Sequence, residues 1–271
     1  LLSMDQIINN LAKWHFMFAG QHRAPIVIRM IIGRGWGQGP QHSQSLQALF
    51  AHIPGLKVVM PATAHDAKGL LISAIEDDNP VIFIEHRWLH GTTGEVQHER
   101  RAEPIGLARL ARKGRDLTIV ALSYMVLESL RAAEALALYG VDAEILDLRS
   151  VSPWDEAAVL ESVRHTGRLI VTDTGHKSFG VSAEILACVS EKAHHWLQSA
   201  PSRIASPDFP CPTSHWLSKD YYPRASAIAE SVLRMLDISS NHPAHSAPAA
   251  LREIENQTFP DIPDSAFMGP F

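Results

Sequence analysis

Short apolar runs alternate along this chain with stretches that have the periodicity of amphipathic helices. In the first third of the chain, apolar runs at 26–32, 57–60 and 81–84 are separated by helical patterns at 43–52 and 63–75. Because the connections are short, crossover helices must join the strands, and this arrangement produces a parallel sheet. The run at 26–32 is apolar almost throughout, which predicts a strand covered on both faces. The pattern therefore predicts an α/β fold.

The same alternation resumes after residue 104. Strands are expected at 117–122, 143–148, 169–173 and 203–205, and helices at 126–139, 154–165, 181–197 and 224–236. Residues 91–103 are polar and lack periodicity. We therefore expect two α/β domains, at 1–90 and 104–238, joined by a linker at 91–103. A helical pattern at 4–18 opens the first domain.

The last part of the chain, residues 239–271, differs in composition from both domains. It holds five prolines and the string SSNHPAHSAPAA. This composition predicts a proline-rich tail without a fixed fold. Phe259, Phe267 and Phe271 are apolar anchors that a solvated tail would not need, so docking of the tail on a neighbouring subunit stays open.

Charge and cysteine content exclude several classes of protein. The formal net charge is −5, which favours neither nucleic acid nor an anionic membrane as a partner. The two cysteines, Cys188 and Cys211, cannot form a disulfide framework, which indicates a reducing compartment. The chain has no apolar run long enough to span a membrane.

A glycine-rich stretch links the first apolar run to the first helical pattern. Glycines at 33, 35, 37 and 39 and then Pro40 predict a loop. The loop would deliver His42 to the first turn of the next helix, with Ser43 or Ser45 as N-cap. There the helix dipole would disfavour imidazolium and keep a neutral ring ready for proton transfer. The chain has 15 histidines, and only this setting singles out His42.

A second candidate site is the sequence Asp77-Asp78-Asn79-Pro80, where a helix ends and a buried strand begins. Unpaired carbonyls at the helix end and the Asp and Asn oxygens could hold a cation. A plain turn with an Asx cap is the alternative. Dinucleotide-binding, P-loop and GxSxG signatures are absent from the sequence.

One continuous stretch resembles a known family. The sequence QHSQSLQALFAHIPGLKVVMPATAHDAKGLLISAIEDDNPVIFIEH, at 41–86, is similar to the beta subunit of thiamin-diphosphate-dependent 2-oxo acid dehydrogenases. The similarity continues through DLRSVSPWD and TGRLIVTD and covers about residues 3–238. The last two motifs lean towards the branched-chain type without fixing the substrate.

The resemblance implies a truncated pyrimidine-binding domain followed by a transketolase C-terminal-type domain. It implies an α2β2 assembly whose active sites lie between the chains, with the diphosphate and Mg²⁺ on the alpha chain. The expected reaction is decarboxylation of a 2-oxo acid, pyruvate or a branched-chain one, and acylation of a lipoyl domain of the acyltransferase core. The implied location is the cytoplasm, or the mitochondrial matrix in a eukaryote.

The resemblance also assigns residues. His42 matches the family's active-site histidine, which assists proton transfer and reductive acylation of the lipoyl group. A structural potassium ion is expected near Ile26, Ala74, Ile75, Asp77 and Asn79, partly through backbone carbonyls. The family's catalytic glutamate and its stacking aromatic residue would precede Leu1, and this chain has no glutamate before Glu76.

We therefore expect a fragment of a longer subunit that is inactive alone, and we assign no cofactor-binding residue. Two alternatives stay open. The first is an acetoin-cleaving or other thiamin-dependent relative. The second is a non-catalytic assembly or interaction chain, because the activating glutamate is missing.

Overall fold

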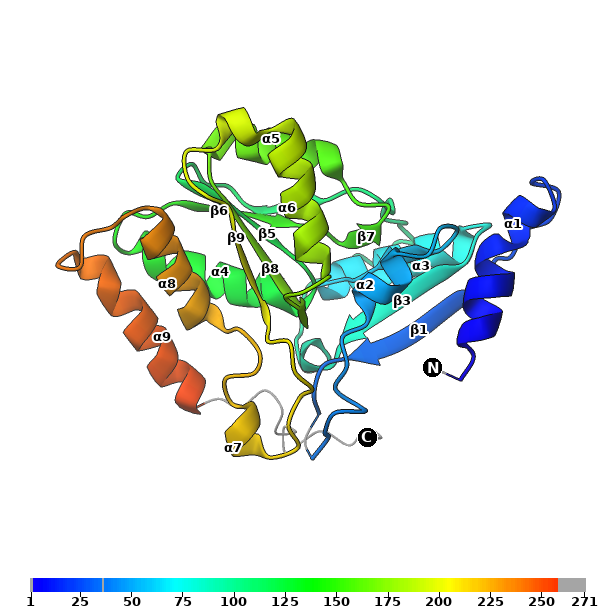
Figure 1. Ribbon diagram of the computed structural model, residues 1–271, viewed down its shortest axis with the longest axis horizontal. Helices are drawn as coiled ribbons and strands as arrows, with labels where there is room; N and C mark the ends of the chain where they lie inside the picture. The colour runs from blue at the N-terminus through cyan, green and yellow to red at the C-terminus, as the bar shows by residue number, and fades with distance from the viewer. Residues whose placement is uncertain (1, 36, 258–271) are drawn as a thin grey trace.

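The computed structural model describes residues 2–35 and 37–257, which form two β-sheets with helices on their faces (Figure 1). One sheet has the strand order β1-β3-β2-β7 and the other β4-β6-β5-β8-β9. The first contains β1 (Val27–Ile32), β2 (Lys57–Val59), β3 (Val81–His86) and β7 (Ser150–Ser152). The second contains β4 (Arg109–Arg112), β5 (Leu117–Ala121), β6 (Ala143–Asp147), β8 (Leu169–His176) and β9 (Ser202–Ser206). The predicted α/β class is confirmed.

The first sheet is built around β3, which pairs in parallel with β1 and β2. Helix α2 (Gln47–Ala51) lies between β1 and β2 in the chain, and α3 (Ala64–Glu76) lies between β2 and β3. Thr63 caps α3, because its hydroxyl accepts a hydrogen bond from the backbone N–H of Asp66 at 3.1 Å. The helix predicted from Thr63 onward is therefore confirmed together with its cap.

Strand β1 is an edge strand in this structure, which corrects the expectation of a strand covered on both faces. It pairs with β3 alone among the described residues. Ile31 is 47% exposed, and only Ile32 of this strand is buried. A continuous apolar run does not distinguish an edge strand from a central one, because neighbours along the sheet are not encoded locally.

Strand β7 joins the two parts of the chain, which we call the first half (2–103) and the second half (104–257). It follows β6 in sequence but pairs antiparallel with β2, with Ser152 opposite Val58. Phe50, Ile82, Leu146 and Val171 belong to one cluster of buried residues that draws on both sheets. The two halves therefore share a sheet and a core.

The second sheet has helices on both faces (Figure 1). Helices α5 (Glu156–Thr166) and α6 (Val181–Lys192) pack together on one face, and α4 (Tyr124–Ala137) packs with α8 (Ala225–Met235) on the other. Short elements α7 (His215–Ser218), η3 (Arg87–Leu89) and η4 (His194–Trp196) lie in the connections. Helices α4, α5 and α8 match the predicted helices to within a few residues, whereas α6 ends at Lys192, before the predicted end at residue 197.

The two ends of the chain compare differently with the prediction. The helix predicted at 4–18 is confirmed as one continuous helical segment over residues 4–17. This segment is irregular, because it changes from the π-helical η1 (Gln6–Asn10) to the 3-10 helix η2 (Leu11–Lys13) and then to α1 (Trp14–Met17). Beyond residue 239, η5 (Pro243–His245) leads into α9 (Ser246–Gln257), which packs on α8 and α4.

Leu251 and Ala247 of α9 are buried, so this part of the expected tail is a folded helix. Apolar side chains on one face of a short polar segment are sufficient to dock it. The anchors Phe259, Phe267 and Phe271 lie outside the described residues. No helix in the described part of the chain is both long and apolar enough to cross a membrane.

Candidate functional site

His42 lies in an exposed turn between β1 and α2. Its predicted place in the first turn of the helix is wrong, because α2 begins at Gln47 after Leu46 and has no side-chain cap. Ser43 and Gln47 are instead buried, so tertiary contacts replace the helical conformation that the serines favour. The dipole of α2 therefore gives no reason for a neutral His42 ring.

Two glycines of this loop are required by close packing. Gly33 has φ +84°, and a Cβ atom there would lie 2.7 Å from the ring of His86. A Cβ atom on Gly39 would lie 2.2 Å from the hydroxyl oxygen of Thr213. Both distances are too short for a real Cβ atom, so neither position can carry a side chain without a shift of its neighbours. The loop therefore packs closely against β3 on one side and against the second half on the other.

Hydrogen bonds from both ends of the loop reach the second half. At the start, Arg34 Nη2 donates to the carbonyl oxygen of Thr213 at 2.7 Å. At the end, Gln47 Nε2 donates to Oδ1 of Asp173 at 2.7 Å, and both side chains are fully buried. Burial raises the pKa of Asp173 above its ordinary value.

His86 is a buried histidine that sequence reasoning missed. Its Nδ1 accepts a hydrogen bond from the backbone N–H of Trp88 at 3.3 Å, and its ring stacks on Tyr124 with centroids 5.0 Å apart. Burial lowers the pKa of His86 to about 3, so its ring is neutral at physiological pH. Trp88 Nε1 in turn donates to the carbonyl of Arg34 at 2.8 Å, which ties this aromatic cluster to the glycine loop.

A cavity of about 490 Å³ opens beside the start of the loop. Its lining includes Arg34, Trp88 and Tyr222, the basic residues Lys219, Arg224 and Arg252, and the acids Asp220 and Glu255. Basic side chains outnumber acidic ones in this lining, which suits an anionic group such as a carboxylate.

The five residues expected around potassium lie at one corner of the first sheet. Ala24 N donates to the carbonyl of Asp78, and Val81 N donates to the carbonyl of Ile26, both at 3.0 Å. These bonds bring the segment before β1 against the turn at 77–80. Ala74 and Ile75 lie in the last turn of α3, where helix carbonyls lack intrahelical partners.

The carboxylate of Asp77 already has partners at this corner. It pairs with Lys57 Nζ, and its Oδ1 accepts the backbone N–H of Asn79 at 2.9 Å, which is the Asx turn left open as the alternative. Burial alone raises the pKa of Asp77, but the hydrogen bonds from Lys57 and Asn79 outweigh it, and the pKa lies below its ordinary value. A cation bound here would share the Asp77 carboxylate with Lys57, and backbone carbonyl oxygens would have to supply its other ligands.

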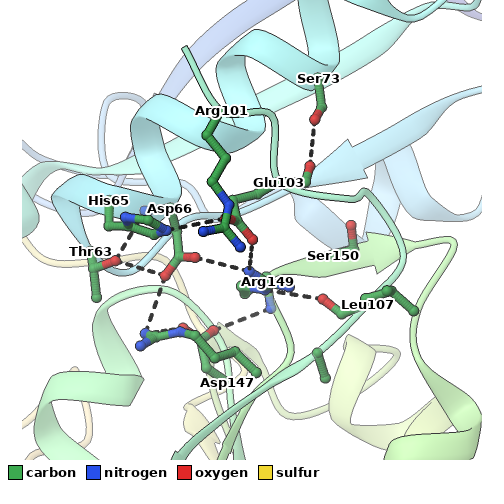
Figure 2. A network of polar contacts seen from close by, with 12 residues as sticks. Thr63, His65, Asp66, Ser73, Arg101, Glu103, Leu107, Asp147, Arg149 and Ser150 are labelled. Carbon is green, nitrogen blue, oxygen red and sulfur yellow. Dashed lines mark hydrogen bonds and ion pairs between the residues drawn. The ribbon is translucent and has the colours of Figure 1, made fainter. Parts of the chain in front are cut away.

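A buried ionic network connects α3, the segment before β4 and the end of β6 (Figure 2). Arg149 Nη1 lies 3.0 Å from Oδ1 of Asp66 and 3.2 Å from Oε2 of Glu103. Arg109 Nη2 lies 3.1 Å from Asp66 and 3.2 Å from Asp147. This network, which we call the Arg149 junction, joins the two halves at a second place.

The Arg149 junction also contains three potential metal ligands. Single ligand atoms of His65, Asp66 and Glu103 lie within 4.8 Å of one another. The guanidinium groups of Arg149 and Arg109 already neutralise these carboxylates, so a metal ion would meet repulsion there. Burial alone raises the pKa of Glu103, but the hydrogen bonds from His65 and Arg149 outweigh burial and hold this pKa below its ordinary value. Burial raises the pKa of Asp147 to about 7.

Comparison with known proteins identifies two domain families. Residues 3–91 match the transketolase pyrimidine binding domain, and residues 106–228 match the transketolase C-terminal domain. Among solved structures, the chain is similar to a split gene transketolase described as an inactive beta4 tetramer. That match has a TM-score of 0.66 and 25% identity, and it covers 80% of this chain and 68% of the other.

Similar curated proteins are subunits of two kinds of oxidoreductase. The beta subunit of acetoin:2,6-dichlorophenolindophenol oxidoreductase of Cupriavidus necator is 45% identical over 232 residues, covering 86% of this chain and 69% of that subunit. The corresponding Bacillus subtilis subunit is 40% identical, covering 86% of this chain and 68% of that subunit. The mitochondrial pyruvate dehydrogenase E1 component subunit beta-1 of Oryza sativa subsp. japonica is 42% identical, covering 86% of this chain and 63% of that subunit. The chain therefore belongs to the transketolase-like family of 2-oxo acid dehydrogenase beta subunits.

Proposed function

We propose that this chain serves as the beta subunit, or a part of it, of an enzyme that decarboxylates a 2-oxo acid on thiamin diphosphate and acylates a lipoyl domain. Pyruvate and branched-chain 2-oxo acids are the proposed substrates. The observation that carries the proposal is the exposed His42 on a loop held by side-chain hydrogen bonds at both ends. An exposed histidine on a fixed loop suits a site that a second chain completes.

In this proposal, His42 exchanges a proton at a ring nitrogen with the reacting group. Thiamin diphosphate, when bound, supplies the carbanion chemistry that no side chain can supply. The chain contributes orientation through the anchored loop and proton transfer through His42. A positioned general acid or base contributes about 10²–10⁴ in rate.

Acetoin is a second candidate substrate, because two of the similar proteins carry acetoin in their names. The test is to co-express the full-length beta subunit with its cognate alpha chain and to assay pyruvate, branched-chain 2-oxo acids and acetoin. Acceptors would be a lipoyl domain and 2,6-dichlorophenolindophenol. Turnover of a 2-oxo acid with lipoyl acylation supports the leading proposal, and turnover of acetoin alone replaces it.

The assembly we propose is α2β2, with Mg²⁺ and the diphosphate on the alpha chain and docking to a lipoyl acyltransferase core. Its proposed location is the cytoplasm, or the mitochondrial matrix in a eukaryote. We expect no turnover by the 271-residue chain alone. If the complex of the full-length beta subunit with the alpha chain turned over none of these substrates, the non-catalytic assembly role would be the better account.

We also propose that potassium binds near Ile26, Ala74, Ile75, Asp77 and Asn79. The convergence of helix-end carbonyls and the Asp77 carboxylate supports this. Melting temperatures in KCl and in choline chloride at equal ionic strength provide the test. A rise specific to K⁺ that is lost in Asp77→Ala is expected. Equal melting temperatures in both salts would contradict a potassium site at this corner.

A further inference from the structure

Tyr222 contacts the backbone beside His42. Its hydroxyl donates to the carbonyl oxygen of Ser43, the residue after His42, at 3.1 Å. Tyr222 and Ser43 are each 3% exposed, so water does not compete for this bond. Tyr222 belongs to the second half, 179 positions away along the chain.

The ring of Tyr222 is fixed by other aromatic side chains. Its centroid lies 4.9 Å from that of Trp88 and 4.9 Å from that of Tyr221. Burial raises the pKa of the Tyr222 phenol above its ordinary value. The hydroxyl therefore stays protonated and remains a donor over the range of pH in which an enzyme works.

The loop around His42 has little local structure of its own. Residues 40–46 belong to neither a helix nor a strand, and the preceding glycines have wide conformational freedom. The anchors of Arg34 and Gln47 are eight and five residues away from His42. Within the loop, the backbone N–H of His42 donates to the Gly39 carbonyl at 3.2 Å. Among the bonds of Arg34, Gln47 and Tyr222 from the loop to the second half, the Tyr222 bond lies nearest to His42 and therefore restricts the His42 backbone more directly than the other two.

We infer that Tyr222 is a positioning residue for His42, and the inference rests on the proposed function of His42. Tyr222 acts through the Ser43 carbonyl. Its loss would widen the range of positions that the imidazole samples and lower the fraction of time spent in the reactive geometry.

Tyr221 offers a matched control within the same cluster. It is 5% exposed, and its hydroxyl donates to the carbonyl of Phe209 at 3.0 Å. Tyr221→Phe and Tyr222→Phe therefore remove the same group from the same kind of bond. Only the second bond reaches the His42 loop.

The first readout needs no cofactor. Hydrogen–deuterium exchange of a peptide covering residues 39–46 should be faster in Tyr222→Phe than in the unmodified chain and unchanged in Tyr221→Phe. A lost hydrogen bond of ordinary strength corresponds to about a three- to tenfold change. Equal exchange in the two variants would overturn the inference.

The second readout is catalytic and uses the complex with the alpha chain. Tyr222→Phe should lower kcat for acyl transfer about three- to tenfold at unchanged KM, and Tyr221→Phe should not. In a His42→Ala background, Tyr222→Phe should have no further effect, because the group it positions is gone.

The outcomes separate the two claims. If His42→Ala leaves acyl transfer unchanged, the proposed function of His42 fails whatever Tyr222 does. If His42→Ala slows acyl transfer and Tyr222→Phe behaves like Tyr221→Phe, only the positioning role is overturned. If Tyr222→Phe lowered the rate of acyl transfer by the same factor with and without His42, the positioning role would also be overturned.

Discussion

Besides the β2–β7 pairing and the shared core, two polar junctions link the halves of this chain, and their chemistry differs. The Arg149 junction is ionic, with a buried arginine between the carboxylates of Asp66 and Glu103 (Figure 2). The contacts of the glycine loop, which we call the loop junction, are hydrogen bonds in which at least one partner is neutral. Arg34 donates to the Thr213 carbonyl, Gln47 donates to the Asp173 carboxylate, and the Tyr222 phenol donates to the Ser43 carbonyl.

The difference separates stability from catalysis. Removing one partner of a buried ion pair destabilises strongly, because the other charge is left uncompensated, so we expect the stability of the fold to depend on each member of the Arg149 junction. The loop bond nearest His42, from Tyr222 to the Ser43 carbonyl, joins two neutral groups. It fixes the backbone there without adding a charge beside the imidazole.

The largest stability effect is expected at the ionic junction. Arg149→Met should cost about 3–5 kcal/mol of unfolding free energy, because Asp66 and Glu103 lose a buried partner. Arg164→Met is the control, since Arg164 forms an exposed pair with Glu161 and its loss should change stability far less. Urea denaturation measures both. Similar losses in the two variants would show that the Arg149 junction is not what fixes the halves.

A pH-dependent effect is expected from His86 at the loop junction. Its folded pKa of about 3 lies below the ordinary 6.5, so protonation favours the unfolded chain. Stability should be full above pH 6.5 and fall as the pH drops towards 3, by up to about 1.4 kcal/mol per pH unit.

His86→Asn should reduce the dependence of the unfolding free energy on pH between pH 4 and 6.5, whatever the stability of the variant at pH 7. The control is His52→Asn at an exposed histidine, which should keep the pH dependence of the unmodified chain. Urea unfolding at a series of pH values measures the unfolding free energies. An unchanged slope in His86→Asn would contradict a buried neutral ring at this junction.

The smallest effect is expected for Asp173→Asn. The raised pKa of Asp173 means that the folded state holds its proton more tightly, so stability declines as the pH rises from 3.8 through the folded pKa. Asparagine keeps an acceptor for Gln47 and removes the titration. Melting curves at a pH below 3.8 and at pH 8 should show a gain of about 1 kcal/mol relative to the parent at pH 8 that is absent at the lower pH. A loss at pH 8 would show that the charge itself is needed.

Much of the fold follows from local sequence. Apolar runs bounded by turns placed seven strands, including β3 and β5, to within a few residues. Strands β4 (RLAR) and β7 (SVS) were missed because they are short and not apolar. Helix α9 was missed because its prolines and polar residues resemble a tail, and only packing on α8 reveals its buried face.

The site was less predictable, because its geometry depends on distant contacts. His42 was identified from its loop and family motif, but its helical setting was wrong. Ser43 and Gln47 bond to residues 179 and 126 positions away, and such contacts override local capping preferences. Nothing in the local sequence singled out Tyr222 or His86. The aromatic-rich surroundings of both residues are the one signal available.

The most direct test of the central claim is His42→Ala in the full-length beta subunit, reconstituted with the alpha chain and measured as single-turnover acylation of a lipoyl domain. Circular dichroism and complex size would confirm that the variant folds and assembles. Acylation should slow by about 10²–10⁴. Acylation at the unmodified rate in an assembled complex would contradict the role of His42.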